Sequence, residues 1–94
     1  MKCDFCSELN PKWQYPSDSF EMPPTGYRST SDWLACETCA SLIENRMFRT
    51  LAMRSKGISD LPATEFREFL ISAVMALHRE FLAHRTGPRI PVQT

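Results

Sequence analysis

Hydrophobic and polar positions alternate in the first third of the chain, a pattern typical of short, half-buried β-strands. Residues 13–15 (WQY) and 20–22 (FEM) each place a polar residue between two apolar ones. Residues 16–19 (PSDS) between them are turn formers, so the pattern predicts a β-hairpin. A third short strand is expected at residues 32–35, directly before a cysteine.

After residue 36 the apolar positions recur every three or four residues, which predicts an α-helix over residues 37–55. Gly57 is expected to cap its C-terminal end, where Arg54 and Lys56 suit the negative end of the helix dipole. The stripe of this helix follows Cys39, Ala40, Ile43, Met47, Thr50, Leu51 and Arg54, and Leu42 and Phe48 widen it.

A second helix is predicted over residues 62–86, after a linker at residues 57–61. Asp60 is expected as its N-cap and Pro62 in its first turn. Gly87-Pro88 is expected to end the helix and to open a loose tail at residues 87–94. Its apolar stripe comprises Phe66, Phe69, Leu70, Ala73, Val74, Leu77 and Phe81, with His84 at the edge.

Length and charge limit the classes of function. The chain has 94 residues, which is enough for one small domain. Its 11 basic and 11 acidic residues give a formal net charge of zero, which argues against a general polyanion binder. The longest uncharged apolar run, residues 69–77, is too short to span a bilayer. The sequence contains no P-loop, dinucleotide-binding glycine pattern or activated nucleophile, so we expect neither an enzyme nor a small-molecule substrate.

The four cysteines form two Cys-x-x-Cys pairs, Cys3 with Cys6 and Cys36 with Cys39. Zinc prefers four ligands at tetrahedral corners, and two such pairs supply four thiolates to one ion. Because this shell is closed, with no position left for a substrate, we predict one structural Zn²⁺. Iron bound by the same four thiolates, as a single ion or a small cluster, is the competing metal.

Two disulfides are the alternative use of the same cysteines. No apolar stretch that resembles a secretory signal precedes Cys3, so we expect a cytoplasmic protein whose thiols stay reduced. A thioredoxin-like redox role is also disfavoured, because neither pair follows a parallel strand in a βαβ unit.

The order of a cysteine knuckle, a β-hairpin and a helix that carries the last two ligands is the treble-clef arrangement. We therefore predict a single α+β domain in which a zinc module, residues 1–56, packs against a long amphipathic C-terminal helix. Zinc binding contributes about 10–16 kcal/mol in small zinc peptides, which is comparable to the whole stability of a small domain. The module is not expected to fold without its metal.

Several motifs resemble a group of short bacterial and phage zinc-binding proteins with a treble-clef-like module. They are CDFC at residues 3–6, WQYP at 13–16, DSF at 18–20, DWLACETC at 32–39 and LIE at 42–44. The resemblance covers residues 1–54 and implies that the four cysteines are metal ligands and that the aromatic residues belong to the core. It implies no enzymatic activity. It permits a role as an inhibitor of a host protein.

The second helix supplies the candidate partner surface, which consists of Phe66, Phe69, Phe81 and Leu82. Either all four side chains pack against the zinc module, or one end of the stripe stays free for a protein partner or a second copy of the chain. The second case defines the first functional hypothesis, a small zinc-stabilised interaction module that acts as an adaptor or regulator.

The alternative hypothesis is a nucleic-acid-binding zinc protein that uses a basic face formed by Arg46, Arg49, Arg54 and Lys56. Binding through such a face would weaken steeply with salt. The aromatic residues that would stack on bases lie mainly in the acidic half of the chain, which weakens this hypothesis. His78 and His84 are six residues apart and fall on different faces of the second helix, so they do not predict a second metal site.

Overall fold

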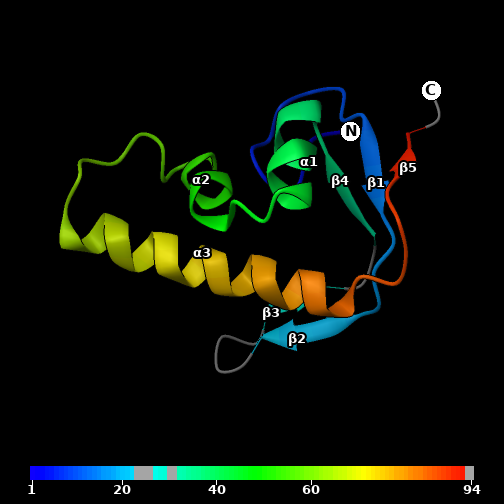
Figure 1. Ribbon diagram of the computed structural model, residues 1–94. Helices are drawn as coiled ribbons and strands as arrows, with labels where there is room; N and C mark the ends of the chain where they lie inside the picture. The colour runs from blue at the N-terminus through cyan, green and yellow to red at the C-terminus, as the bar shows by residue number, and fades with distance from the viewer. Residues whose placement is uncertain (23–26, 30–31, 93–94) are drawn as a thin grey trace.

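The computed structural model describes residues 1–22, 27–29 and 32–92. Within them the fold is α+β, with two small antiparallel sheets, two short helices and one long C-terminal helix (Figure 1). The four cysteines cluster beside the N-terminal sheet, as predicted for a zinc module followed by a long helix. The elements in chain order are β1 (Trp13–Tyr15), β2 (Phe20–Met22), β3 (Tyr27–Ser29), β4 (Trp33–Ala35), α1 (Glu37–Glu44), α2 (Phe48–Met53), α3 (Glu65–His84) and β5 (Ile90–Pro91).

The three predicted strands are present, but the predicted hairpin between the first two is wrong. β1 pairs antiparallel with β4, and β2 pairs antiparallel with β3 in a separate sheet. The intervening residues bond to the end of α3 instead of closing a turn. The carbonyl of Pro16 accepts a hydrogen bond from the amide of Thr86 at 3.0 Å, and the amide of Asp18 donates to the carbonyl of His84 at 2.9 Å. This segment therefore carries the chain from one sheet to the other along the C-terminal end of α3.

The C-terminal tail was expected to be loose, but as far as residue 92 it is held on the sheet. β5 lies on the free edge of β1, opposite β4, with Gln14 paired to Ile90. The amide of Val92 donates to the carbonyl of Lys12 at 3.0 Å. The guanidinium of Arg89 lies 4.1 Å from the centre of the Trp13 ring, a cation–π contact. Residues 93–94 lie outside the described part of the chain.

The helix predicted over residues 37–55 is broken into α1 and α2. Arg46 adopts a left-handed backbone with φ of 56°. Its amide donates to the carbonyl of Ile43, and the amide of Met47 donates to the carbonyl of Leu42, at 3.1 and 2.9 Å. These two bonds form a Schellman motif, which ends a helix and redirects the chain. α2 therefore leaves α1 at an angle and packs on α3 (Figure 1).

α3 begins and ends two or three residues inside the predicted bounds. Its N-cap is Thr64 rather than Asp60, and the Thr64 hydroxyl accepts from the amide of Arg67 at 3.5 Å. Glu65 and Glu68 occupy the first turn, where acidic side chains suit the positive end of the helix dipole. No helix among the described residues combines the length and apolar character needed to cross a membrane.

Phe81, near the C-terminal end of α3, is fully buried and joins the long helix to the N-terminal half of the chain. Its ring centre lies 5.6 Å from that of Phe5, 5.8 Å from Tyr15 and 5.0 Å from Trp33. Aromatic groups at these separations pack favourably beyond the area that they bury. The long helix is therefore part of the same core as the cysteine-bearing segments.

Candidate metal centre

The first cysteine pair lies in a tight turn between Lys2 and Leu9, which form an isolated antiparallel bridge. The amide of Ser7 donates to the carbonyl of Cys3 at 2.9 Å, and Ser7 has a left-handed φ of 69°. The backbone amide of Phe5 donates to the Cys3 sulfur at 3.4 Å. Because the Phe5 side chain is buried in the aromatic core, it anchors the turn between the two cysteines.

The second pair lies at the junction of β4 and α1. Cys36 is the N-cap of α1, and its sulfur accepts a hydrogen bond from the amide of Cys39 at 3.4 Å. Free amides and the positive end of the helix dipole stabilise negative charge at this position. Asp4 joins the two pairs, because its amide and carboxylate bond to the carbonyl and amide of Leu34 at 2.8 and 2.7 Å.

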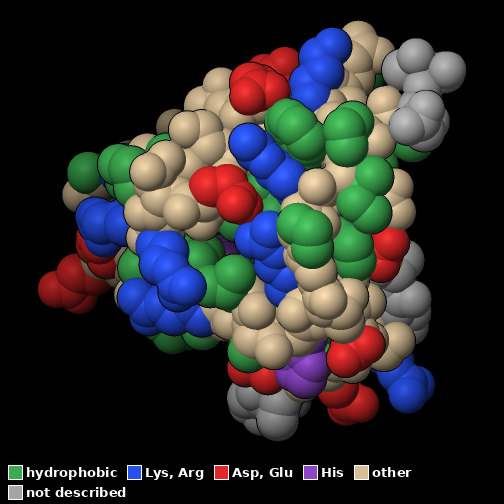
Figure 2. Space-filling view, turned by 45° about the vertical axis from the view of Figure 1, so that its right-hand side comes forward, with side chains coloured by type: hydrophobic (Ala, Val, Ile, Leu, Met, Phe, Trp, Pro, Cys, Tyr) green, Lys and Arg blue, Asp and Glu red, His purple; other side chains and the backbone are tan. Residues whose placement is uncertain are grey.

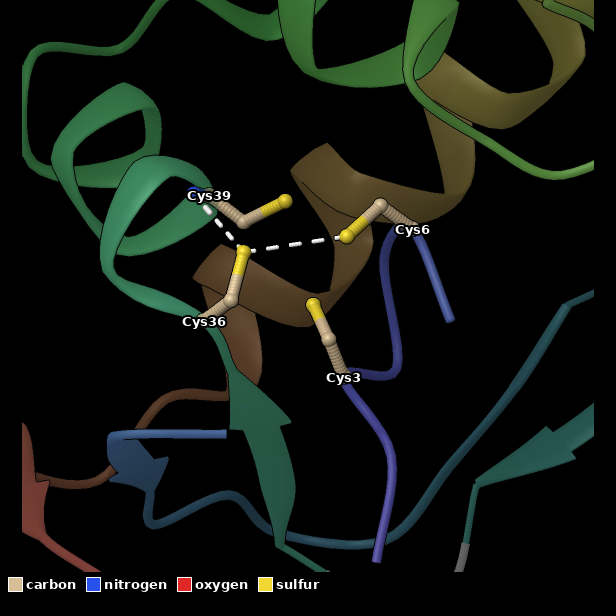
Figure 3. A group of neighbouring side chains, drawn as sticks. All are labelled: Cys3, Cys6, Cys36 and Cys39. Atoms are coloured by element: carbon tan, nitrogen blue, oxygen red, sulfur yellow. Dashed lines mark hydrogen bonds between the residues drawn. The ribbon is translucent and has the colours of Figure 1, made fainter. Parts of the chain in front are cut away.

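The four cysteine sulfurs point toward one another from these two turns (Figure 3). All four Sγ atoms lie within 4.8 Å of one another, and those of Cys6 and Cys36 are 3.7 Å apart. Four sulfurs at tetrahedral corners, each about 2.3 Å from a zinc-sized ion, are separated by about 3.8 Å. The cluster therefore has the ligand type, number and spacing to hold one metal ion. All four cysteines are free thiols, so the structure does not support the disulfide alternative.

Arg54 is the first residue after α2, and its side chain lies against the four cysteine sulfurs. Its Nε donates to the sulfur of Cys39 at 3.4 Å, and its Nη2 donates to Cys6 and Cys36 at 3.6 and 3.9 Å. The hydrogen bond to Cys39 raises the pKa of Arg54 above its already high ordinary value. A fixed positive charge here would offset part of the negative charge that four thiolates bring to a divalent ion.

Without an ion the cysteines do not ionise independently. The hydrogen bond between Cys3 and Cys39 lowers the pKa of Cys3 and raises that of Cys39, because one sulfur keeps the shared proton. Burial raises the pKa of Cys6. A divalent cation would release these protons, since thiolates rather than thiols are the metal ligands.

The chain matches no family model, no curated protein and no solved structure. What the centre can do chemically is therefore inferred from its four sulfurs and the residues around them.

Cys3 and Cys39 are buried, whereas Cys6 and Cys36 are half-buried. A hollow of about 290 Å³ opens beside Cys36 and Arg54; it is also lined by Glu8, Leu9, Asn10, Lys12, Glu37 and Thr38. Of the four cysteines, Cys36 alone is among the lining residues of this hollow.

The four basic residues of the nucleic-acid hypothesis differ in their surroundings. Arg54 points to the sulfurs, and Arg49 forms a two-point ion pair with Glu68 at 2.9 and 2.8 Å. Arg46 lies in the break between α1 and α2, and like Lys56 it is exposed. Figure 2 shows Lys and Arg side chains with acidic side chains among them on one face of the molecule.

Of the four candidate partner residues, the structure separates two from the others. Phe81 is fully buried in the aromatic core and Leu82 packs half-buried against that core, so this end of the candidate surface is covered. Phe66 and Phe69 are 61% and 68% exposed. The buried stripe of α3 instead runs through Ile71, His78 and Phe81.

The two histidines have different surroundings, and neither belongs to the cysteine group. His84 stacks on Phe20 with ring centres 5.0 Å apart, and its Nε2 lies 3.0 Å from a carboxylate oxygen of Glu80. His78 is only 2% exposed and lies against Phe5 at 5.0 Å. Among the described residues its Nδ1 has no hydrogen-bond partner, and burial lowers the pKa of His78 to about 4. The spacing of apolar residues in the sequence predicts His84 at the edge of the buried stripe of this helix, whereas in the structure His78 is the buried histidine.

Proposed function

We propose that this chain is a small zinc-stabilised module for protein–protein interaction, acting as an adaptor or regulator. The observation that carries the proposal is the pair of exposed phenylalanines, Phe66 and Phe69, on a helix fixed to the metal-binding half of the fold. Large apolar side chains exposed together on a rigid element are typical of contact surfaces. The inhibitor role permitted by the resemblance to phage proteins is one form of this proposal.

Zinc is the metal we propose for the four cysteines. A Cys₄ shell at tetrahedral spacing suits zinc, and zinc binds such ligands more tightly than ferrous iron does. The same shell leaves no coordination position open for a substrate, which supports a structural rather than an enzymatic role. Reduced cysteines also require a reducing compartment, so we propose the cytoplasm as the location.

The metal part of the proposal is tested by a native mass spectrum of the chain purified without added metal. We expect one zinc ion per chain. A chain that carries iron, or a metal-free chain four hydrogens lighter than the reduced mass, would contradict it.

The interaction part is tested by the double variant Phe66→Ser/Phe69→Ser. The matched control is Ile90→Ser, which removes an apolar side chain that is 45% exposed on β5. Immobilised zinc-loaded chains are compared for the proteins they retain from an extract, with a second copy of the chain counted as one of them. We expect the wild type and Ile90→Ser to retain a protein and the double variant to lose it. Equal retention by the wild type and both variants would contradict the proposal.

A further inference from the structure

The exposed side of α3 carries an apolar row with the spacing of a coiled-coil seam. Phe66, Phe69, Ala73 and Ala76 follow intervals of three, four and three residues, and all four are exposed. Ile71 and His78, on the opposite side of the helix, are the residues that face the core. The row therefore points away from the protein, where a second helix can lie along it.

The row is graded in size from one end to the other. Two large aromatic residues stand at the N-terminal end, and two alanines stand about 10 Å further along the helix. An antiparallel copy of the same helix reverses this order, so that Phe66 lies over Ala76 of the second copy and Phe69 over Ala73. The small residues allow the two helices to approach closely enough to cover both rings.

The charges that flank the row are complementary in the same register. Glu65 and Arg79 are exposed on the same edge of the row, two heptads apart, and neither forms an ion pair with another described residue. In the antiparallel pairing that matches Phe with Ala, Glu65 of one copy meets Arg79 of the other. The twofold axis generates this contact twice.

We propose that the occupant of this row is a second copy of the chain, and that α3 pairs antiparallel with its symmetry mate over residues 65–79. This inference rests on the proposed interaction function and names its partner. The helix carries both members of each contact: the phenylalanines and the alanines that they cover, and the acid Glu65 and the base Arg79. That self-complementarity is what an isologous twofold interface requires.

The test measures the mass of the full, zinc-loaded chain by sedimentation and native mass spectrometry over a concentration series. We expect a dimer that Phe66→Ser or Phe69→Ser each weakens roughly tenfold or more, while Ile90→Ser leaves it unchanged. One zinc per chain in every variant shows that the fold is intact. A monomer at all concentrations, or a dimer that the Phe variants leave intact, would overturn the inference.

The register is tested by charge reversal. Glu65→Arg and Arg79→Glu each place like charges together twice in a homodimer, so each variant alone dimerises more weakly. Mixing the two variants makes both contacts attractive, and the heterodimer then exceeds the share of about one half that random pairing gives. Random pairing in the mixture would overturn the antiparallel register. Monomeric wild type with one zinc per chain and Phe-dependent retention of another protein would refute self-pairing but leave the interaction function standing.

Discussion

The Nε of Arg54 lies 3.4 Å from the sulfur of Cys39, although fifteen residues separate them in the sequence. Because the same guanidinium also reaches two further cysteines, a single side chain ties the residue after α2 to both cysteine pairs. Hydrogen bonds to metal ligands hold the ligands in place and adjust their charge. Arg54 is therefore placed to act as a positioning residue for a metal ion held by the four cysteines.

Replacement of Arg54 is expected to weaken metal binding without removing a ligand. Arg54→Gln should lower zinc affinity roughly 10- to 100-fold, which is the usual cost of losing an outer hydrogen-bond partner. Arg54→Lys should recover only part of the loss, since a compact ammonium cannot reach several sulfurs as the planar guanidinium does. Competition with a coloured chelator measures the affinity.

The matched control for this prediction is Arg49→Gln, which removes the same charge from an exposed ion pair on α2. Exposed pairs contribute little to stability, so this variant should bind zinc like the wild type. Equal affinities for Arg54→Gln and Arg49→Gln would show that Arg54 does not support the centre.

Removal of the metal is expected to unfold both the cysteine segments and their contact with α3. Phe5 lies between Cys3 and Cys6 in the sequence and packs on Trp33 with ring centres 5.2 Å apart, and Phe81 of α3 packs on both aromatic rings. Zinc binding of about 10–16 kcal/mol equals or exceeds the typical stability of a small domain. A chelator should therefore shift the tryptophan fluorescence to longer wavelength and abolish the near-ultraviolet dichroism.

Return of zinc to the chelated sample is the control, and it should restore both spectra. If instead the native spectra persist in a sample that mass spectrometry shows to be metal-free, the metal is not required for the fold.

The cysteine cluster could be predicted from the sequence because its information is local. Two ligands three residues apart suit one ion whatever the rest of the chain does, and the turn and helix N-cap that present them are short-range structures. The existence of β1 and β2 was local information too, since alternation of apolar and polar residues marks a strand. Which strand pairs with which is not local, and there the prediction of a β1–β2 hairpin failed.

The role of Arg54 could not be predicted, because it depends on the direction that α2 takes after the helix break. The apolar period continues through the break, and arginine is an uncommon residue in the left-handed conformation of Arg46. The buried side of α3 was also ambiguous. Spacings of three and four residues fit a stripe through Phe66 and Phe69 as well as one through Ile71 and His78, and only packing chose between them.

His78 is expected to make the fold sensitive to mild acid. Its pKa is about 4 in the folded chain against an ordinary 6.5, so the unfolded chain takes up the proton first as pH falls. The contribution of the neutral, buried imidazole to the free energy of unfolding is fully present above pH 6.5 and is lost as the pH falls from 6.5 toward 4. Between pH 7 and pH 5 this loss amounts to about 2 kcal/mol.

The variant His78→Leu removes this titrating group and its unpartnered Nδ1 together. The free energy of unfolding, measured by urea titration of zinc-loaded protein at each pH, should fall less steeply toward pH 5 in this variant than in the wild type. His84→Gln is the control, because His84 is half-buried and bonded to Glu80. Parallel pH profiles for wild type and His78→Leu would refute the role of His78.

Glycine at position 46 is expected to stabilise the fold. Arg46 holds a φ of 56° at the position of the Schellman motif where glycine is the usual residue. Glycine adopts this conformation without the steric cost that a side chain carries, so Arg46→Gly should raise the free energy of unfolding by about 0.5–1 kcal/mol.

Arg49→Gly, inside α2, is the control. It should lower the free energy of unfolding by about 1 kcal/mol, because glycine is a poor helix former. Thermal melts of the two zinc-loaded variants, followed by circular dichroism, should therefore shift in opposite directions. Destabilisation by both substitutions would mean that the left-handed turn does not govern the break between α1 and α2.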